Sequence, residues 1–253
     1  MTAVNAFIGR DRAFMLTDAS MYTAYGTVMA FGQKAVAIPN LRAVIASRGV
    51  QKTTAILAME LSLMQSFDAL LERAEYILPD YHQKHLMELS AAGGQDINIV
   101  VVGWSDEANA PLGFCFDSTT ETFEMIDGYV AGPVPSDEEN YNLLSIGCRP
   151  QRDVPVAIFD PVEHGIPYME AQRRMKIQVS DICEPMSIVG GHVLLSEVTR
   201  DGVSQRVIHR WDDEPGEPIE PEPFHGSAPL ERTLNRAERR RLGIAAKKKA
   251  HAR

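Results

Sequence analysis

Short apolar and alternating stretches open the chain, a stretch of helical period follows, and alternation then returns. The opening stretches predict strands at residues 3–8, 13–17, 35–38 and 42–46. Apolar residues recur every three or four positions between residues 50 and 76, which predicts a helix; they are Ile56, Met59, Leu63, Phe67, Leu70 and Leu71. We expect Pro79 to break this helix and residues 81–89 to form a second one, ended by residues 91–94.

The second half of the chain has fewer clear elements. Alternation predicts three strands that form a meander, followed later by two more strands, at residues 97–104, 113–116, 122–126, 192–199 and 205–211. Arg200-Asp201-Gly202 is a good hairpin turn for the last two strands. Residues 166–177 are the one clear helix here, and residues 150–164, with three prolines, are expected to be irregular. The pattern therefore predicts an α+β protein built on antiparallel sheets.

The C-terminus differs from the rest of the chain in composition. Residues 212–223 are acidic and rich in proline, which predicts an extended, poorly packed linker. Residues 232–253 contain nine Arg and Lys and a single Glu, a formal charge of +8, so the remainder of this −9 chain carries −17. We therefore divide the chain into a folded domain at 1–211, an acidic linker at 212–229 and a disordered basic tail at 230–253. The basic tail is a candidate for binding nucleic acid or an acidic partner, and a merely solvated tail is the alternative.

Composition excludes several other classes of protein. The hydrophobic content of 45% is sufficient for a core, and the sequence has neither an apolar run long enough to span a membrane nor a secretory signal. Cys115, Cys148 and Cys183 are odd in number and far apart, which favours buried thiols in a reducing cytoplasm. The histidines form no metal-binding pattern, and we expect no metal or cofactor.

The candidate chemistry begins at Thr2. Met1 precedes a small residue, so we expect its removal, which would leave Thr2 with a hydroxyl nucleophile and a free α-amine. That amine has an ordinary pKa of about 7.7–8.0 and can serve as the general base. Asp18 and Lys34 follow at equal steps of sixteen residues. A lysine cation near Thr2 would lower the pKa of the hydroxyl and the amine, and an aspartate would hold that lysine in place.

These residues stand in a recognisable context. The run from Thr2 through the turn Gly9-Arg10-Asp11-Arg12 to Asp18 resembles the N-terminal hairpin of proteasome β-type subunits and of the related bacterial HslV protease. Lys34 before a strand, and Gly49 between a strand and a helix, match the next two elements of that family. The resemblance implies the Ntn-hydrolase fold, a four-layer αββα sandwich of two antiparallel sheets with helices outside.

The resemblance also implies an activity. Thr2 would attack an amide, with peptides or proteins as the expected substrates, and would form an acyl-enzyme ester that water hydrolyses. A backbone N–H near Gly49 would stabilise the oxyanion. The family assembles into rings, so a homo-oligomer is implied, and residues 20–25 and 46–51 would line the specificity pocket.

Two positions depart from the family pattern. Gly190-Gly191 matches a family glycine pair, but the aspartate and serine that support the site would fall at Met186 and Val189. Ser187 or Asp181 could replace them only at a different spacing, and the loop at residues 128–133 lacks the family serine. The alternative hypothesis is therefore a catalytically inactive proteasome-like scaffold or assembly subunit, which could bind nucleic acid through residues 232–253.

Overall fold

The computed structural model describes residues 2–23, 25, 27–50, 52–91, 94, 96–146, 148, 159–178 and 184–224. Met1, Asp181, Cys183 and the predicted basic tail lie outside the described residues. Within the described residues the protein is a mixed α+β structure with three antiparallel sheets and four α-helices. None of the described helices combines the length and the apolar character that crossing a bilayer requires.

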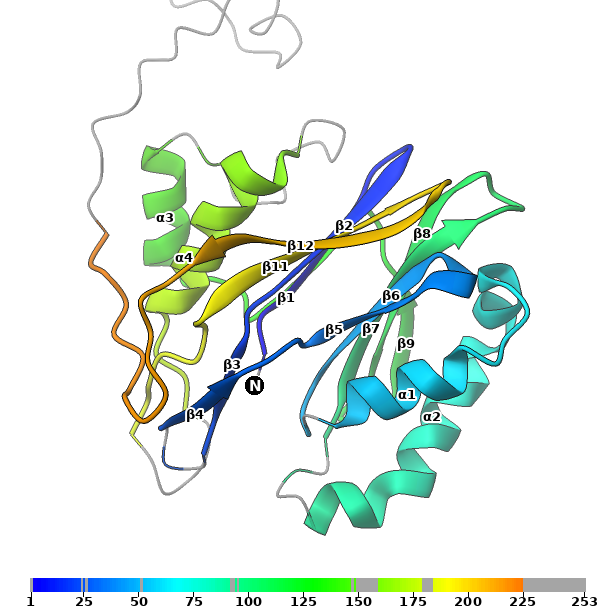
Figure 1. Cartoon of the computed structure of the whole chain (residues 1–253), viewed down its shortest axis with the longest axis horizontal. Coiled ribbons are helices and arrows are strands. Elements are labelled where there is room, and N and C mark those ends of the chain that lie inside the picture. The colour runs from blue at the N-terminus through cyan, green and yellow to red at the C-terminus, as the bar shows by residue number, and fades with distance from the viewer. Residues whose placement is uncertain are drawn as a thin grey trace, which may run out of the picture.

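Two five-stranded sheets form the centre of the molecule (Figure 1). Sheet I has the strand order β10 (Tyr129–Gly132), β1 (Val4–Ile8), β2 (Arg12–Thr17), β11 (His192–Thr199), β12 (Gly202–Arg210). Sheet II has the order β5 (Ala35–Ile38), β6 (Ala43–Arg48), β7 (Asn98–Ser105), β8 (Ala110–Asp117), β9 (Thr122–Met125). A two-stranded ribbon, β3 (Ser20–Tyr22) and β4 (Val28–Phe31), extends from the end of β2.

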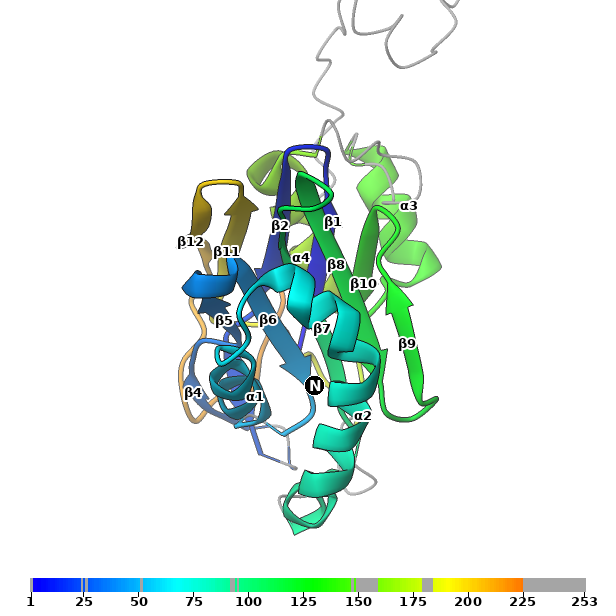
Figure 2. The ribbon, with the colours of Figure 1, turned by 90° about the vertical axis from the view of Figure 1, so that its right-hand side faces the viewer.

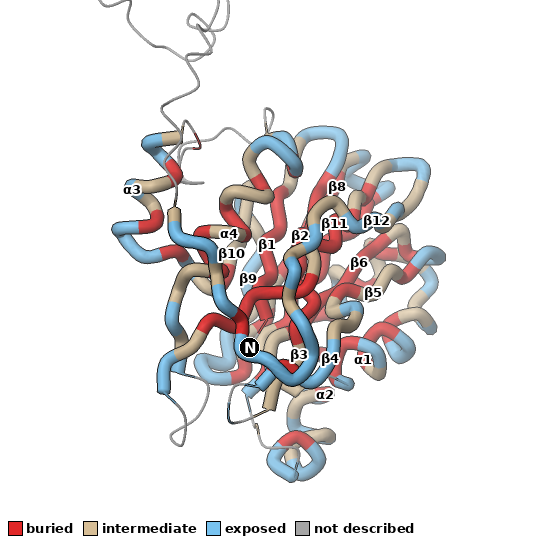
Figure 3. Tube along the Cα trace, turned by 60° about the vertical axis from the view of Figure 1, so that its left-hand side comes forward, coloured by how far each residue is buried: buried red, intermediate tan, exposed pale blue. Residues whose placement is uncertain are grey.

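Three of the four apolar clusters in the described residues define the layers. The first lies between the sheets and contains Val4 and Met15 of sheet I with Val44 and Val100 of sheet II. The second joins the other face of sheet II to α1 (Thr53–Leu61) and α2 (Phe67–Ala91). The third joins the other face of sheet I to Met169 of α4 (Ile166–Arg174). Figures 1 and 2 show α1 and α2 beside sheet II, and Figure 3 shows the buried positions concentrated in the strands.

The predicted strands are confirmed, with ends that shift by at most three residues. The alternation that predicted them arises because successive side chains of a strand face opposite sides of the sheet. Sequence analysis missed the short strands β3, β4 and β10.

The helix predictions need two corrections. The helix predicted over residues 50–76 is in fact two helices, because Ser66 starts a new one: its hydroxyl accepts a hydrogen bond from the Ala69 N–H (3.1 Å). The predicted break at Pro79 is wrong, since Pro79 lies inside the 25-residue α2. A proline removes one helical hydrogen bond, and the buried residues Leu78 and Tyr81 hold the helix against sheet II on both sides of it.

Sequence analysis also missed α3 (Asp137–Ser145), where only α4 was expected. The signal was present, because Ser136 accepts a hydrogen bond from the Glu139 N–H and three acidic residues occupy the first turn. A serine cap and acidic residues both stabilise a helix N-terminus. Just before α4, residues 161–165, predicted to be irregular, form the short π-helix η4 (Pro161–Gly165).

The acidic, proline-rich segment also differs from expectation. Residues 212–224 form neither helix nor strand and are mostly exposed, as expected, but the side chains of Asp213 and Ile219 are buried against the rest of the protein. Ile219 is only 3% exposed, and the backbone of Val28 in β4 exchanges hydrogen bonds with Gly216 and Glu217. The segment therefore runs against the β3–β4 ribbon, as the orange trace in Figure 1 shows. The division of the chain at residues 211 and 229 remains a prediction.

Candidate active site

Asp18 is the centre of a buried polar cluster at the end of β2. Its carboxylate accepts hydrogen bonds from the Ala3 N–H (3.0 Å), the Ser20 N–H (3.1 Å) and the Ser20 hydroxyl (2.7 Å). Lys34 Nζ lies 2.9 and 2.8 Å from the two carboxylate oxygens. Asp18 therefore joins the N-terminal strand, the β3 strand and Lys34 through one side chain.

The Lys34–Asp18 ion pair is removed from solvent. The Lys34 side chain is 8% exposed and that of Asp18 is not exposed at all. Burial lowers the pKa of Lys34 below its ordinary value of 10.5, and the charge of Asp18 only partly offsets this. Burial thus makes Lys34 easier to deprotonate than an exposed lysine, while the bound Asp18 carboxylate favours its cation.

Thr2 lies at the edge of this cluster. It is 6% exposed, and the N–H of the next residue, Ala3, is the one bound by Asp18. Val4 and Ala6 both face the core between the sheets. If the alternation of β1 continues back to Thr2, its side chain faces the same gap.

Strand register brings the β6–α1 junction to the same place. Ala35 pairs with Ala46 in the antiparallel β5–β6 ladder, so Lys34 lies opposite Ser47, two residues before Gly49. In both Figure 1 and Figure 2 the N-terminus lies near the end of β6 that leads into α1.

The backbone at Gly49 has a conformation that favours glycine. Its φ is +118°, and a Cβ at this position would lie 2.6 Å from the Asp96 carbonyl oxygen. The preceding strand end is fixed to α1 by a 2.6 Å hydrogen bond between the Ser47 and Thr54 hydroxyls. Gly49 is exposed, so its backbone is open to a bound molecule. The catalytic roles assigned to Thr2, Asp18, Lys34 and Gly49 remain predictions.

Sequence analysis did not single out Arg48, which adds a second cation near the site. Its guanidinium lies against Gly132, where a Cβ would collide with it, and Gly132 pairs with Val4 of β1. Burial lowers the pKa of Arg48, and the charge of Asp117 partly offsets this. Arg48 Nε is buried without a hydrogen-bond partner. The local sequence of β6 does not predict that Arg48 lies near the site, because its contact with Gly132 depends on the pairing of β1 with β10.

The expected supporting side chains are apolar, as the sequence indicated. Val189 is fully buried and Met186 packs against the same apolar cluster. Ser187, considered as a substitute, is buried, and its hydroxyl has no hydrogen-bond partner. Among the described residues, Asp18 is instead supported by Ser20 and by the Gly190 N–H, at 3.4 Å.

The remaining titratable candidates do not form a second centre. The described residues contain no group of three His, Cys, Asp or Glu that could hold a metal ion. Cys115 and Cys148 are free thiols, and burial raises the pKa of Cys148 to about 11. His192, at the start of β11, has its pKa lowered by burial and by Arg210.

No protein-family model matches the chain, and a search of curated proteins finds no significant match.

Proposed function

We propose that this protein is an N-terminal threonine hydrolase that cleaves amide bonds, with peptides as the substrate class. The observation that carries the proposal is the buried Lys34–Asp18 pair, which binds the backbone of Ala3 beside Thr2. Structural ion pairs are common, but this pair stands at the end of the strand that would carry an N-terminal nucleophile. In this proposal Thr2 supplies the nucleophile and the amine, Lys34 supplies the cation, and Asp18 anchors Lys34.

The proposal includes the four-layer αββα architecture of the Ntn hydrolases. Its support is the packing of the apolar clusters: the two sheets share one core, and helices cover the opposite face of each sheet. β1, which follows Thr2, contacts β6, which leads to Gly49, across this core. Self-association remains part of the proposal by resemblance, and sedimentation velocity would test it.

The proposed mechanism uses Thr2, Lys34, Asp18 and the backbone near Gly49. After removal of Met1, the Thr2 hydroxyl attacks the carbonyl carbon and its proton passes to the α-amine. The Lys34 cation favours the alkoxide and the unprotonated amine, and Asp18 holds Lys34 in place. The oxyanion accepts hydrogen bonds from backbone N–H groups at the β6–α1 junction near Gly49. The amine then returns the proton to the leaving nitrogen, and water hydrolyses the Thr2 ester.

Intact-mass measurement with a covalent probe tests this function. We expect the purified chain to begin at Thr2 and to gain one equivalent of a β-lactone, bound as an ester to the Thr2 hydroxyl. The Thr2→Ala variant should not be labelled, whereas Thr27→Ala, which alters an exposed threonine, should be labelled like the wild type. Labelling that persists in Thr2→Ala would place the nucleophile elsewhere.

The second candidate function is an inactive scaffold of the same family. The apolar Met186 and Val189 and the unpartnered hydroxyl of Ser187 favour it, because an active site of this type needs polar support around its charged residues. A retained Met1 would block the α-amine and favour this candidate. The same mass spectrum therefore separates the two functions.

A further inference from the structure

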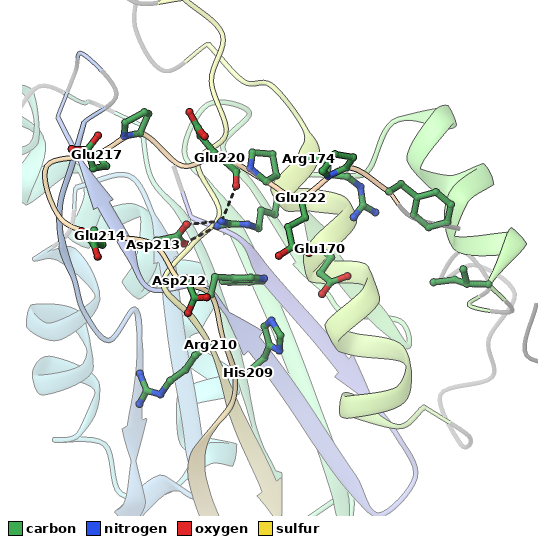
Figure 4. A pocket seen from close by; sticks show the side chains of 17 residues that line it. Glu170, Arg174, His209, Arg210, Asp212, Asp213, Glu214, Glu217, Glu220 and Glu222 are labelled. Carbon is green, nitrogen blue, oxygen red and sulfur yellow. Dashed lines mark hydrogen bonds and ion pairs between the residues drawn. The ribbon is translucent and has the colours of Figure 1, made fainter. Parts of the chain in front are cut away.

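A second buried ion pair connects the C-terminal segment to the core. Arg173 of α4 forms a bidentate pair with Asp213, with Nη1 at 2.8 Å from Oδ2 and Nη2 at 2.5 Å from Oδ1. The two side chains are 7% and 6% exposed. Arg173 also stacks over Trp211, 4.9 Å from the ring centre, and its Nη2 donates to the Glu220 carbonyl (3.4 Å). In Figure 4 dashed lines join Asp213 to this guanidinium, whereas none is drawn at the neighbouring Asp212 and Glu214.

Both members of this pair also hold the segment that precedes β11. Arg173 Nη1 donates to the Val189 carbonyl (2.9 Å), and Asp213 Oδ2 accepts from the Gly191 N–H (2.7 Å). The contact is so close that a Cβ on Gly190 would lie 2.6 Å from Asp213 Oδ2 and 2.8 Å from Ile219 Cδ1. The backbone of residues 189–191 is therefore clamped between α4 and the C-terminal segment.

The clamped backbone is in direct contact with the candidate active site. The Gly190 N–H points to Asp18 Oδ2 (3.4 Å), and the Gly190 carbonyl accepts from the Ala19 N–H (3.0 Å). The Ser20 hydroxyl, which lies 2.7 Å from Asp18 Oδ2, also lies 2.5 Å from the Ile188 carbonyl oxygen, so its single proton is shared between these two acceptors. A displacement of residues 188–191 would therefore move the groups that fix Asp18, and Asp18 fixes Lys34.

We propose that Arg173 and Asp213 are positioning residues for the Asp18–Lys34 pair, and that the acidic C-terminal segment is thereby part of the active-site structure. Met186 and Val189 are apolar, so their side chains cannot form hydrogen bonds that support Asp18. Arg173 and Asp213 support Asp18 indirectly, through their hydrogen bonds to the backbone of residues 189–191. The catalytic part of this proposal rests on the function proposed above. The effect on the pKa of Lys34 does not rest on that function, because this pKa is a property of the folded protein.

The test uses full-length protein with Asp213→Asn and the matched control Asp212→Asn, which alters an exposed neighbour. The apparent pKa of Lys34 is measured by NMR titration of its side chain, with its signals assigned by their loss in Lys34→Met. We expect Asp213→Asn to lower that pKa by about one pH unit, because a loosened Asp18 stabilises the cation less. Asp212→Asn should leave it unchanged. β-Lactone labelling at Thr2 should slow about tenfold to a hundredfold in Asp213→Asn alone.

The outcomes separate this inference from the proposed function. A folded Asp213→Asn protein with an unchanged Lys34 pKa overturns the positioning role, even if Thr2 is labelled. A lowered pKa in a protein whose Thr2 never reacts upholds the positioning role and refutes the hydrolase. If Asp213→Asn does not fold, Arg173→Lys replaces it, since lysine keeps the charge but cannot bind Asp213 and Val189 in the same geometry. An unchanged Lys34 pKa in that variant likewise overturns the inference.

Discussion

Replacement of Lys34 by methionine is the sharpest perturbation of the candidate site. Methionine keeps most of the length of the side chain and removes only the charge and the hydrogen bonds. Asp18 would then remain as a buried carboxylate without a cation, because its side chain has no exposed surface. Both stability and reactivity should therefore respond to the same change.

The expected loss of stability follows from the burial of the pair. Removal of one partner of a buried ion pair costs about 3 to 5 kcal/mol. Asp18 keeps its bonds to the Ala3 N–H and to Ser20, so we expect the lower end, about 3 kcal/mol. At about 2 to 4 °C per kcal/mol, the Tm should fall by about 6 to 12 °C. The double variant Lys34→Met/Asp18→Asn should recover part of this loss, since no charge is then left unpaired.

The expected loss of reactivity comes from the missing cation. Removal of one group that stabilises a transition-state charge typically slows a reaction by about a hundredfold to a thousandfold. We expect Lys34→Met to slow β-lactone labelling at Thr2 by that factor, and the double variant should not restore it. Stability is measured by urea unfolding and labelling by time-resolved mass spectrometry, both on folded protein well below the Tm.

Lys52→Met is the matched control, because it also removes a lysine from an ion pair, but an exposed one. Lys52 Nζ lies 3.9 Å from Glu88 Oε2. It should change the free energy of unfolding by less than about 1 kcal/mol and leave labelling unaltered. Near-normal labelling of Thr2 in folded Lys34→Met would refute the assignment of Lys34 as the activating cation. Loss of labelling in Lys52→Met as well would mean that the assay reports stability rather than chemistry.

Three other predictions follow from the structure. Gly49→Ala should destabilise the protein by about 1 to 3 kcal/mol, measured by urea unfolding. The reason is that the φ of Gly49 is +118° and the new Cβ would meet the Asp96 carbonyl oxygen. An unchanged free energy of unfolding would contradict this backbone conformation at residue 49. Truncation after residue 224 should leave the Tm close to that of the full chain. Truncation after residue 211 should lower the Tm, since this shorter protein lacks Asp213 and the buried Ile219. Equal Tm values for the two truncated proteins would mean that residues 212–224 do not pack on the core. The rate of Thr2 labelling should rise as the α-amine loses its proton, at a pH below the ordinary value of about 7.7–8.0, because the Lys34 cation favours the unprotonated amine. The rate should fall again at a pH below 10.5, because burial lowers the pKa of Lys34; a rate that stays constant beyond pH 10.5 would exclude Lys34 from the mechanism.

The sequence by itself determined the elements with a clear local period. Short apolar runs identified the strands that became β1, β2, β5 and β6, since a strand buried on both faces is apolar at nearly every position. The sequence also determined the candidate residues Thr2, Asp18 and Lys34, because each stands close to the end or the beginning of such a strand. The cap at Ser136 shows that α3 could have been found in the same way.

Only the tertiary structure decided what depends on contacts between distant residues. Pro79 did not end its helix, because packing on sheet II outweighed the local loss of a hydrogen bond. The acidic segment after β12 has the composition of a solvated linker, yet Asp213 is buried because an arginine forty residues away in the chain meets it. Composition describes how a segment interacts with water, whereas burial depends on which partner the fold places beside it. The support of Asp18 by backbone groups of residues 188–191 was hidden for the same reason, since a backbone N–H or carbonyl leaves no mark in the amino-acid sequence.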